Sequence, residues 1–320
     1  MSPADGYSIR SYRAEDEARI GDLWNLCLTR DEIALNTFRR KVVLDANFDA
    51  QGCFVAEGGG SPVGFLLSIR RRHPYYDLGL EPGRGWITVM FVHPEWRRRG
   101  IGKRLVGHAE AFLRHQGVCE VSVSDYTPNY FLPGVDLDAY GTCRLLLESC
   151  GYRKVQSVYG MGRSLVDFQT PSEIQERLNG LRGTGLSVSV FRPSHTLQLL
   201  EFLRRDYPGD LFNVARERLV QDPECDEILV ALHDGQVIGF SHFQDEHFGP
   251  FGIAKEYTGR GFGLMLFYAT VDQMRKKGRQ NLWLAWTSGR AKDFYYRLGL
   301  RVKRRHVIMN KILSGPGPSP

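Results

Sequence analysis

The chain has 320 residues, of which 42% are hydrophobic, and 42 basic against 36 acidic side chains give a formal net charge of +6. This length corresponds to about two domains, and such an apolar content is ordinary for chains that bury a core. No segment reaches the roughly 20 consecutive apolar residues that a membrane helix needs, and the N-terminus has no signal-peptide pattern. We therefore expect a cytoplasmic protein that does not act at a membrane.

The cysteines and histidines indicate neither disulfides nor a metal. The six cysteines show no C-x-x-C spacing and most lie in apolar contexts, which is typical of buried free thiols in a reducing compartment. The nine histidines show no ligand spacing. We expect no metal site.

The first strong pattern along the chain is a strand, a turn and a helix. Residues 86–92 are rich in β-branched and aromatic types, and apolar residues from Ile101 onward recur at helical spacing. The turn between them has the form R-x-x-G-x-G from Arg97 to Gly102. Because a helix N-terminus offers unpaired N–H groups and a positive dipole end, and glycine has no Cβ, we expect Gly100 and Gly102 to let a pyrophosphate approach.

A second copy of this pattern follows, with Gly261 and Gly263 in place of Gly100 and Gly102. Other landmarks also recur, so the chain is interpreted as a duplication. The number of residues that separates equivalent landmarks in the two copies falls along the chain. This fall locates two insertions in the first copy, over residues 70–84 and 127–141. Long loops of this kind commonly shape a substrate site.

Composition places the boundary between the copies at a polar stretch. We expect a first domain over residues 1–165, a linker over 166–185, a second domain over 186–313 and a disordered tail over 314–320, which is made of Ser, Gly and Pro.

Both copies resemble the GNAT superfamily of acetyl-CoA-dependent N-acetyltransferases. The resemblance rests on the R-x-x-G-x-G turn and on the F-Y-Y-R-L-G-L ending at 294–300; the second turn departs from the pattern at Thr258. It implies an α+β fold of two tandem GNAT domains, each a twisted, mostly antiparallel sheet flanked by helices. Acetyl-CoA would bind as co-substrate at the two turns, through Phe91, Val92, Arg97, Arg98, Arg99, Gly100, Ile101, Gly102 and Lys103, and through Ile253, Thr258, Gly259, Arg260, Gly261, Phe262 and Gly263.

The implied reaction is direct transfer of an acetyl group to a primary amine of a small molecule or peptide. It needs a base for the amine and an acid for the leaving thiolate. The resemblance places the acid at Tyr295, where the first copy has Leu147, which cannot donate a proton. Glu246 stands before the second strand and is the candidate base, with His247 as its alternative. We therefore expect the chemistry in the C-terminal domain.

Alternatives remain open at this point. The N-terminal copy could catalyse instead, with Asp125, Tyr126, Tyr130 or Tyr140 from its long loop. A non-catalytic acyl-CoA sensor or scaffold is the second candidate function. The arginine clusters at 70–72, 97–99 and 301–305 could indicate nucleic acid, but no recognition motif accompanies them, so no nucleic-acid partner is expected. The acceptor and the oligomeric state do not follow from the sequence.

Overall fold

The computed structural model describes residues 6–180 and 185–313, and these form two units. The first unit comprises Met1–Tyr159 together with Arg304–Pro320, and the second comprises Gly160–Lys303. The predicted α+β fold of two mostly antiparallel sheets flanked by helices is confirmed. The predicted disordered tail, 314–320, lies outside the described residues.

The sheet of the first unit has the strand order β1-β2-β3-β4-β5-β13, and β6 pairs with β13. All of its neighbouring strands are antiparallel except β4 and β5, which run parallel. Its elements are β1 (Tyr7–Ser11), α1 (Glu17–Cys27), α2 (Leu35–Phe38), β2 (Cys53–Gly58), β3 (Ser61–Arg70), β4 (Arg84–Val92), α3 (Ile101–His115), β5 (Glu120–Val123), β6 (Val135–Asp136), α4 (Gly141–Ser149) and most of β7 (Arg153–Ser164) and β13 (Arg301–Ile312).

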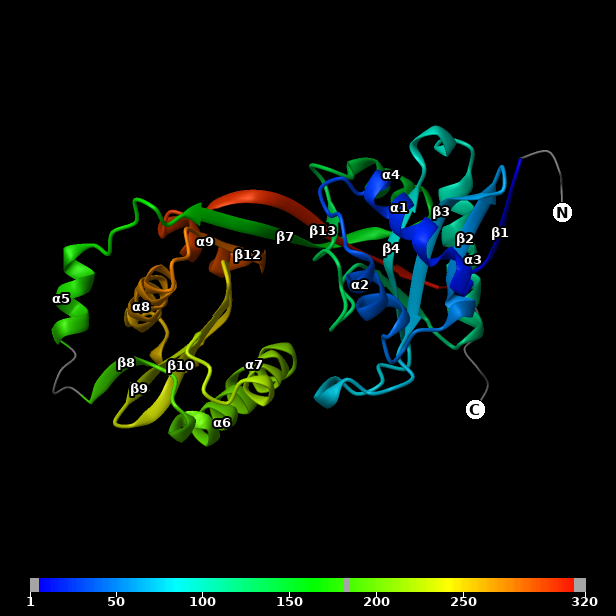
Figure 1. Cartoon of the computed structure of the whole chain (residues 1–320). Coiled ribbons are helices and arrows are strands. Elements are labelled where there is room, and N and C mark those ends of the chain that lie inside the picture. The colour runs from blue at the N-terminus through cyan, green and yellow to red at the C-terminus, as the bar shows by residue number, and fades with distance from the viewer. Residues whose placement is uncertain (1–5, 181–184, 314–320) are drawn as a thin grey trace. The chain divides into compact units, whose positions relative to one another are not determined.

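Side chains alternate between the two faces of this sheet, as strand geometry requires. Phe65 and Leu67 of β3 pack with Trp24 of α1 on one face, while Leu66 packs with Leu105 and Leu113 of α3 on the other. The predicted strand and helix around the first glycine turn are present as β4 and α3 (Figure 1).

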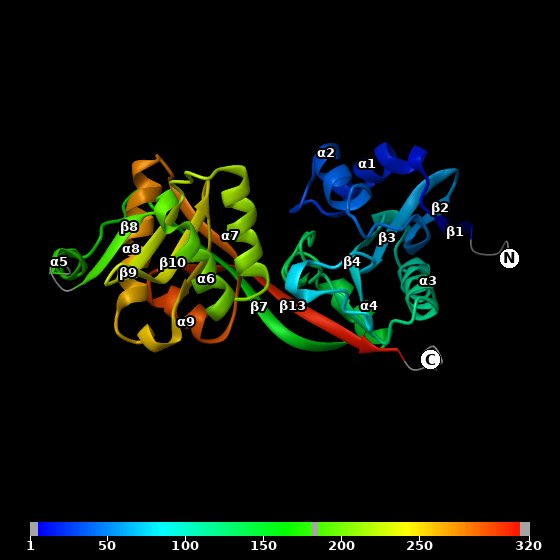
Figure 2. The same ribbon diagram turned by 90° about the horizontal axis from the view of Figure 1, so that it is seen from below.

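The second unit repeats this plan. Its sheet has the order β8-β9-β10-β11-β12, with the end of β7 beside β12. Figure 2 shows α8 on one side of β9 and β10 and the α6–α7 pair on the other. The elements are α5 (Ser172–Gly180), β8 (Leu186–Val190), α6 (Thr196–Asp206), α7 (Asp210–Gln221), β9 (Ile228–His233), β10 (Gln236–Gln244), β11 (His247–Ile253), α8 (Phe262–Lys276), β12 (Asn281–Thr287) and α9 (Gly289–Arg297).

The observed units differ from the predicted boundaries at both ends of the second domain. Residues 166–185 were expected to be a linker, but they contain α5, whose Ile174 is buried. Residues 304–313 were expected to belong to the second domain, but they complete the sheet of the first unit. Met309 of β13 pairs with Val123 of β5. Local patterns could not predict this, because the pairing joins segments that lie far apart in the sequence.

The last strand also supplies part of the first unit's core. Val307, Met309 and Leu313 are buried in the cluster that contains α3, and Lys311 pairs with Glu110 of that helix at 2.7 Å. Met309 is fully buried, whereas Ile312 is 68% exposed. The first unit therefore depends on a segment that follows the whole of the second.

A pair of substitutions in β13 tests this dependence. Met309→Ala should lower the free energy of unfolding by about 2–5 kcal/mol, because it leaves a cavity in the core. Ile312→Ala should change it by less than about 0.5 kcal/mol. Chemical denaturation of both variants measures the difference. Equal effects would show that β13 is not part of the core.

Candidate functional site

The first glycine turn lies between the end of β4 and the start of α3. Phe91 and Val92 end the strand, and Arg97, Arg98, Arg99 and Gly100 are exposed in the turn. The Arg97 Nε donates to the Val92 carbonyl at 3.1 Å, and Arg99 donates to the Glu95 carbonyl at 3.2 Å. Ile101, Gly102 and Lys103 form the first turn of α3, where backbone N–H groups have no intrahelical acceptor. The turn therefore presents N–H donors and cationic side chains on an exposed surface.

Positions 100 and 102 of this turn are occupied by glycine for different structural reasons. Gly100 is the N-cap of α3 and has φ +80°, a left-handed conformation that glycine adopts without strain. At Gly102 a Cβ would lie 2.7 Å from the Leu146 Cδ2 of α4. The absence of a side chain at Gly102 therefore lets α4 approach α3. The sequence pattern assigned this glycine to phosphate binding and did not predict this packing role.

A cavity opens where β4 and β5 separate. In the described chain these strands pair over Arg84–Ile87 of β4 only, and β4 continues to Val92. The cavity has a volume of about 70 Å³. Apolar side chains from β4, β5, α1 and the 127–141 loop line most of it, with a polar wall of Asp31, Asp136 and Tyr140; the lining also includes Trp24, Ile87, Met90, Val123, Phe131 and Cys143. It lies along the part of β4 that leads to the glycine turn.

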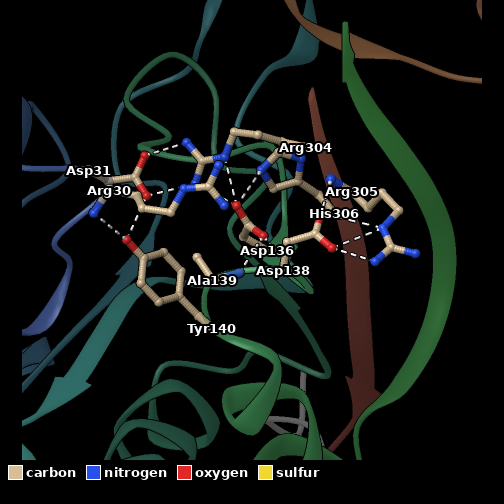
Figure 3. A network of polar contacts seen from close by, with 9 residues as sticks. All are labelled: Arg30, Asp31, Asp136, Asp138, Ala139, Tyr140, Arg304, Arg305 and His306. Atoms are coloured by element: carbon tan, nitrogen blue, oxygen red, sulfur yellow. Dashed lines mark hydrogen bonds and ion pairs between the residues drawn. The ribbon is translucent and has the colours of Figure 1, made fainter. Parts of the chain in front are cut away.

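The polar wall is one hydrogen-bond network within the first unit (Figure 3). The Tyr140 hydroxyl donates to Asp31 Oδ2 at 2.8 Å and accepts the Arg30 N–H at 3.3 Å. Arg304 of β13 binds both Asp31 oxygens, at 2.6 and 2.7 Å. The same guanidinium donates from Nε to Asp136 Oδ2 at 2.6 Å. Three segments far apart in the sequence therefore meet at one wall.

The network favours an ionised Asp136 carboxylate and a protonated Tyr140 phenol. Burial and the nearby Asp31 carboxylate raise the pKa of Tyr140. Although burial alone would raise the pKa of Asp136, hydrogen bonds from the Ala139 N–H, Arg304 and the Asp138 N–H hold it below its usual value. Burial raises the pKa of the Cys143 thiol to about 12. The Tyr140 hydroxyl and the Cys143 thiol thus keep their protons at neutral pH.

The second glycine turn follows β11, which ends at Ile253. Thr258, Gly259 and Arg260 lead to Gly261, the N-cap of α8 with φ +90°. Phe262 and Gly263 begin the helix. The backbone thus repeats the first turn, but its surroundings differ.

Side chains of the second unit occupy the neighbourhood of this turn. The Tyr207 hydroxyl donates to the Ile253 carbonyl at 2.7 Å and accepts the Ile253 N–H at 2.9 Å. A Cβ added at Gly261 would collide with the Arg177 guanidinium of α5. In the first unit the residue equivalent to Ile253 is Val92, whose carbonyl is bonded to Arg97 of the turn itself. The approach to the second turn is therefore covered by the protein's own groups.

Tyr295 lies on α9 inside an aromatic cluster. Its ring is 8% exposed and lies within 6.5 Å of Phe248, Phe251, Phe267 and Phe294, measured between ring centroids. Burial raises its pKa. Packing against these rings is a sufficient explanation for an aromatic residue at position 295. The role of Tyr295 as the acid that protonates the leaving thiolate stays a prediction. Leu147, its counterpart, is fully buried in the core of the first unit.

Glu246 lies in the turn between β10 and β11, at the opposite end of β11 from the glycine turn. Its carboxylate accepts hydrogen bonds from the Asn281 N–H at 2.9 Å and the Gln280 N–H at 3.2 Å, at the start of β12. His247 stacks at a tilt against Trp283, with ring centroids 4.5 Å apart, and burial lowers its pKa. Glu246 thus has a structural role in this turn, and its role as base stays a prediction.

Four residues of the first copy were alternative catalytic candidates: Asp125, Tyr126, Tyr130 and Tyr140. Of these four, Tyr140 is the one that lines the cavity. Tyr126 is buried and donates to Asp45 at 3.0 Å, while Asp125 pairs with Arg84 at 2.8 Å. The Tyr130 carbonyl accepts a hydrogen bond from Lys41 at 2.9 Å. These three side chains are not part of the cavity lining.

Two of the arginine clusters are used within the fold. Arg71 is 2% exposed, pairs with Glu81 at 2.8 Å and lies against the rings of Tyr75, Trp86 and Tyr126. Arg71 is therefore part of the packed interior and not of a solvated basic surface. In the cluster at 301–305, Arg304 and Arg305 pair with aspartates.

One group of possible metal ligands occurs in the part of the chain that the structure describes. Cys225, Glu227 and His242 are buried and close together. Arg218 and Arg279 approach the two Glu227 oxygens at 3.3 and 3.6 Å, so guanidinium groups compete for the carboxylate. None of the described helices is long and apolar enough to cross a membrane.

Residues 19–130 and 196–300, together more than half of the chain, match the acetyltransferase (GNAT) family. The chain belongs to this family. Each match contains one of the two glycine turns, so the family relationship covers both copies. It supports acyl transfer as the general chemistry.

Several solved structures have this fold. One is a GCN5-related N-acetyltransferase from Sphaerobacter thermophilus, with TM-score 0.70, 19% identity and coverage of 98% of this chain and 97% of that chain. Another is a tandem GNAT protein from the clavulanic acid biosynthesis pathway, with TM-score 0.63, 16% identity and coverage of 97% and 99%. A GCN5-related glucosamine N-acetyltransferase region of a fungal multi-domain GH3 β-N-acetylglucosaminidase has TM-score 0.78 and 19% identity; the match covers 95% of this chain but 38% of the fungal chain.

The two glycines of α3 offer a test of the packing at the first turn. Gly102→Ala should destabilise the protein by up to about 1 kcal/mol, because the Leu146 side chain must move aside for the added Cβ. Gly107 lies in the same helix with nothing within 4 Å of an added Cβ. Gly107→Ala should therefore stabilise it by roughly 0.5–1 kcal/mol. Thermal denaturation measures both, and a stabilising Gly102→Ala would contradict the packing role.

Proposed function

We propose that the chain is an acetyl-CoA-dependent N-acetyltransferase and that the transfer takes place in the first unit. The supporting observation is the cavity that lies along β4 where β4 and β5 separate, because Asp31 and Tyr140 belong to its lining. The sequence favoured the C-terminal copy. In that copy Tyr207 already binds both backbone groups of Ile253, and Arg177 covers Gly261, which supports the first unit instead.

The first turn fits a pyrophosphate. Its exposed arginines and the N–H groups of the first helical turn provide donors for anionic oxygens, and the helix dipole adds to the attraction. The stretch of β4 from Thr88 to Val92 continues past its pairing with β5, so its backbone can bind an extended pantetheine arm. The second unit would then act as a scaffold and as the source of strand β13.

The polar wall can receive the acceptor amine. A hydroxyl oxygen has two lone pairs. The Arg30 N–H takes one of those on Tyr140, and the other can accept a hydrogen bond from an amine in the cavity.

Acetyl-CoA would supply the acetyl group in activated form, as a thioester. Tyr140 and Asp31 would remove the amine proton in one relay: the Tyr140 oxygen takes it while the Tyr140 proton moves to Asp31 Oδ2, which already accepts it in a hydrogen bond. The amine nitrogen bonds to the acetyl carbon and the C–S bond breaks. The leaving CoA thiolate then takes a proton from the Tyr140 hydroxyl, and the proton on Asp31 returns to the phenol. The apolar remainder of the lining would exclude water from the thioester.

The acceptor is a primary amine of a small molecule or peptide. The description of the fungal relative names glucosamine, so amino sugars belong in the first screen of acceptors. Free thiols at all six cysteines support a reducing, cytoplasmic setting.

Two tyrosine variants decide between the units. Tyr140→Phe removes the relay hydroxyl and keeps the ring, so kcat should fall by roughly 10²- to 10⁴-fold with acetyl-CoA affinity nearly unchanged. Tyr295→Phe should keep kcat within about threefold of the wild type, because packing explains that ring. An amine screen that detects the released CoA thiol provides the assay.

The opposite pattern, with loss in Tyr295→Phe and full activity in Tyr140→Phe, would place the chemistry in the second unit. Binding of acetyl-CoA without turnover of any amine would support the sensor function and overturn the proposed enzyme.

A further inference from the structure

We propose that Arg304 is a positioning residue for the site of the first unit, where it holds the Asp31 carboxylate in the orientation that receives the Tyr140 proton. This inference rests on the proposed function. Because Arg304 lies on β13, the last strand of the chain would complete the site of the first unit.

The contact between Arg304 and Asp31 is a two-point one. Nη1 donates to Oδ1 at 2.6 Å and Nη2 donates to Oδ2 at 2.7 Å. A planar guanidinium that binds both oxygens fixes the rotation of the carboxylate as well as its position. Oδ2 is also the acceptor of the Tyr140 hydroxyl. The orientation of the relay acceptor therefore depends directly on Arg304.

Arg304 is itself held on its other side. Its Nε donates to Asp136, which is fully buried. The second oxygen of Asp136 accepts the N–H groups of Asp138 and Ala139, at 2.7 and 2.9 Å. The Tyr140 N–H donates to the Asp136 carbonyl at 2.9 Å. One guanidinium thus links the carboxylate that receives the proton to the loop that carries the hydroxyl (Figure 3).

The neighbouring arginine provides a contrast. Arg305 pairs with Asp138, but its side chain is 60% exposed and its partner is not in the cavity lining. Arg304 is 23% exposed, and both of its partners line the cavity. Adjacent residues on one strand therefore differ in whether their ion pair reaches the site.

Kinetic measurements on Arg304→Met, with Arg305→Met as the matched control, test the role of Arg304. Arg304→Met should lower kcat by roughly 10- to 100-fold with the KM for acetyl-CoA unchanged, and Arg305→Met should leave both near wild type. Because Arg304 acts through the relay, Arg304→Met should add no further loss in a Tyr140→Phe background. Arg304→Lys keeps the charge but not the two-point contact, so it should lose kcat too, to a smaller extent.

A second measurement does not depend on turnover. With 3-fluorotyrosine incorporated at position 140, the ¹⁹F resonance reports the hydrogen bond to Asp31. It should move in Arg304→Met and Arg304→Lys and stay in place in Arg305→Met. All kinetics are measured well below the melting temperature of each variant, which separates positioning from folding.

Wild-type kcat in the folded Arg304 variants, an unmoved resonance, or losses that multiply with that of Tyr140→Phe would overturn the inference and leave the proposed function standing. A wild-type protein that acetylates no amine would overturn the proposed function, and the inference would fall with it.

Discussion

The pairing of β13 with β5 is the interaction on which the first unit depends. It gives β5 a partner on the side away from β4, brings Val307, Met309 and Leu313 into the core, and carries Arg304 to the cavity wall. The segments it joins lie far apart in the sequence, so the entropy lost in ordering the long intervening chain must be offset by the surface they bury. A site assembled in this way cannot be complete in a fragment that ends after the first copy.

The two copies share one backbone pattern, but the side chains around it differ. Each has a strand, a glycine N-cap in the left-handed region and a helix. In the first copy this turn is exposed, and a cavity lies along the strand that precedes it. In the second copy Tyr207 satisfies the backbone groups at the end of β11, and aromatic rings pack around Tyr295. A turn motif therefore indicates where a phosphate could bind, whereas the side chains around it decide whether the approach is open.

The duplication, the α+β class and both glycine turns could be predicted from the sequence, because each leaves a local signal: strand and helix periodicity, or glycine where a left-handed N-cap is needed. The sequence also predicted that the first copy's long loop shapes a substrate site; in the structure this loop lines the cavity, and the substrate site stays a prediction. Asp31, Asp136 and Arg304 could not be found in this way. They belong to three segments with no common spacing, and a long-range strand pairing brings them together.

Sequence patterns also do not show which side chains surround a candidate catalytic residue, so they could not decide between the two copies. Tyr295 stands at the family's position for the acid, and sequence alone does not reveal that its ring is enclosed by four phenylalanines. Tyr140 was one of four loop candidates with equal standing, and only its hydrogen bond to Asp31 at the cavity distinguishes it. Glu246 likewise matched the position of a base, while the start of β12 occupies its carboxylate.

A crystal structure of the protein with CoA would show whether the cofactor binds in the first unit. We expect one CoA per chain, with its pyrophosphate on the N–H groups that follow Gly100 and its thiol in the cavity beside Tyr140. A CoA bound at Gly261, with Arg177 and Tyr207 displaced and the first turn unused, would contradict it.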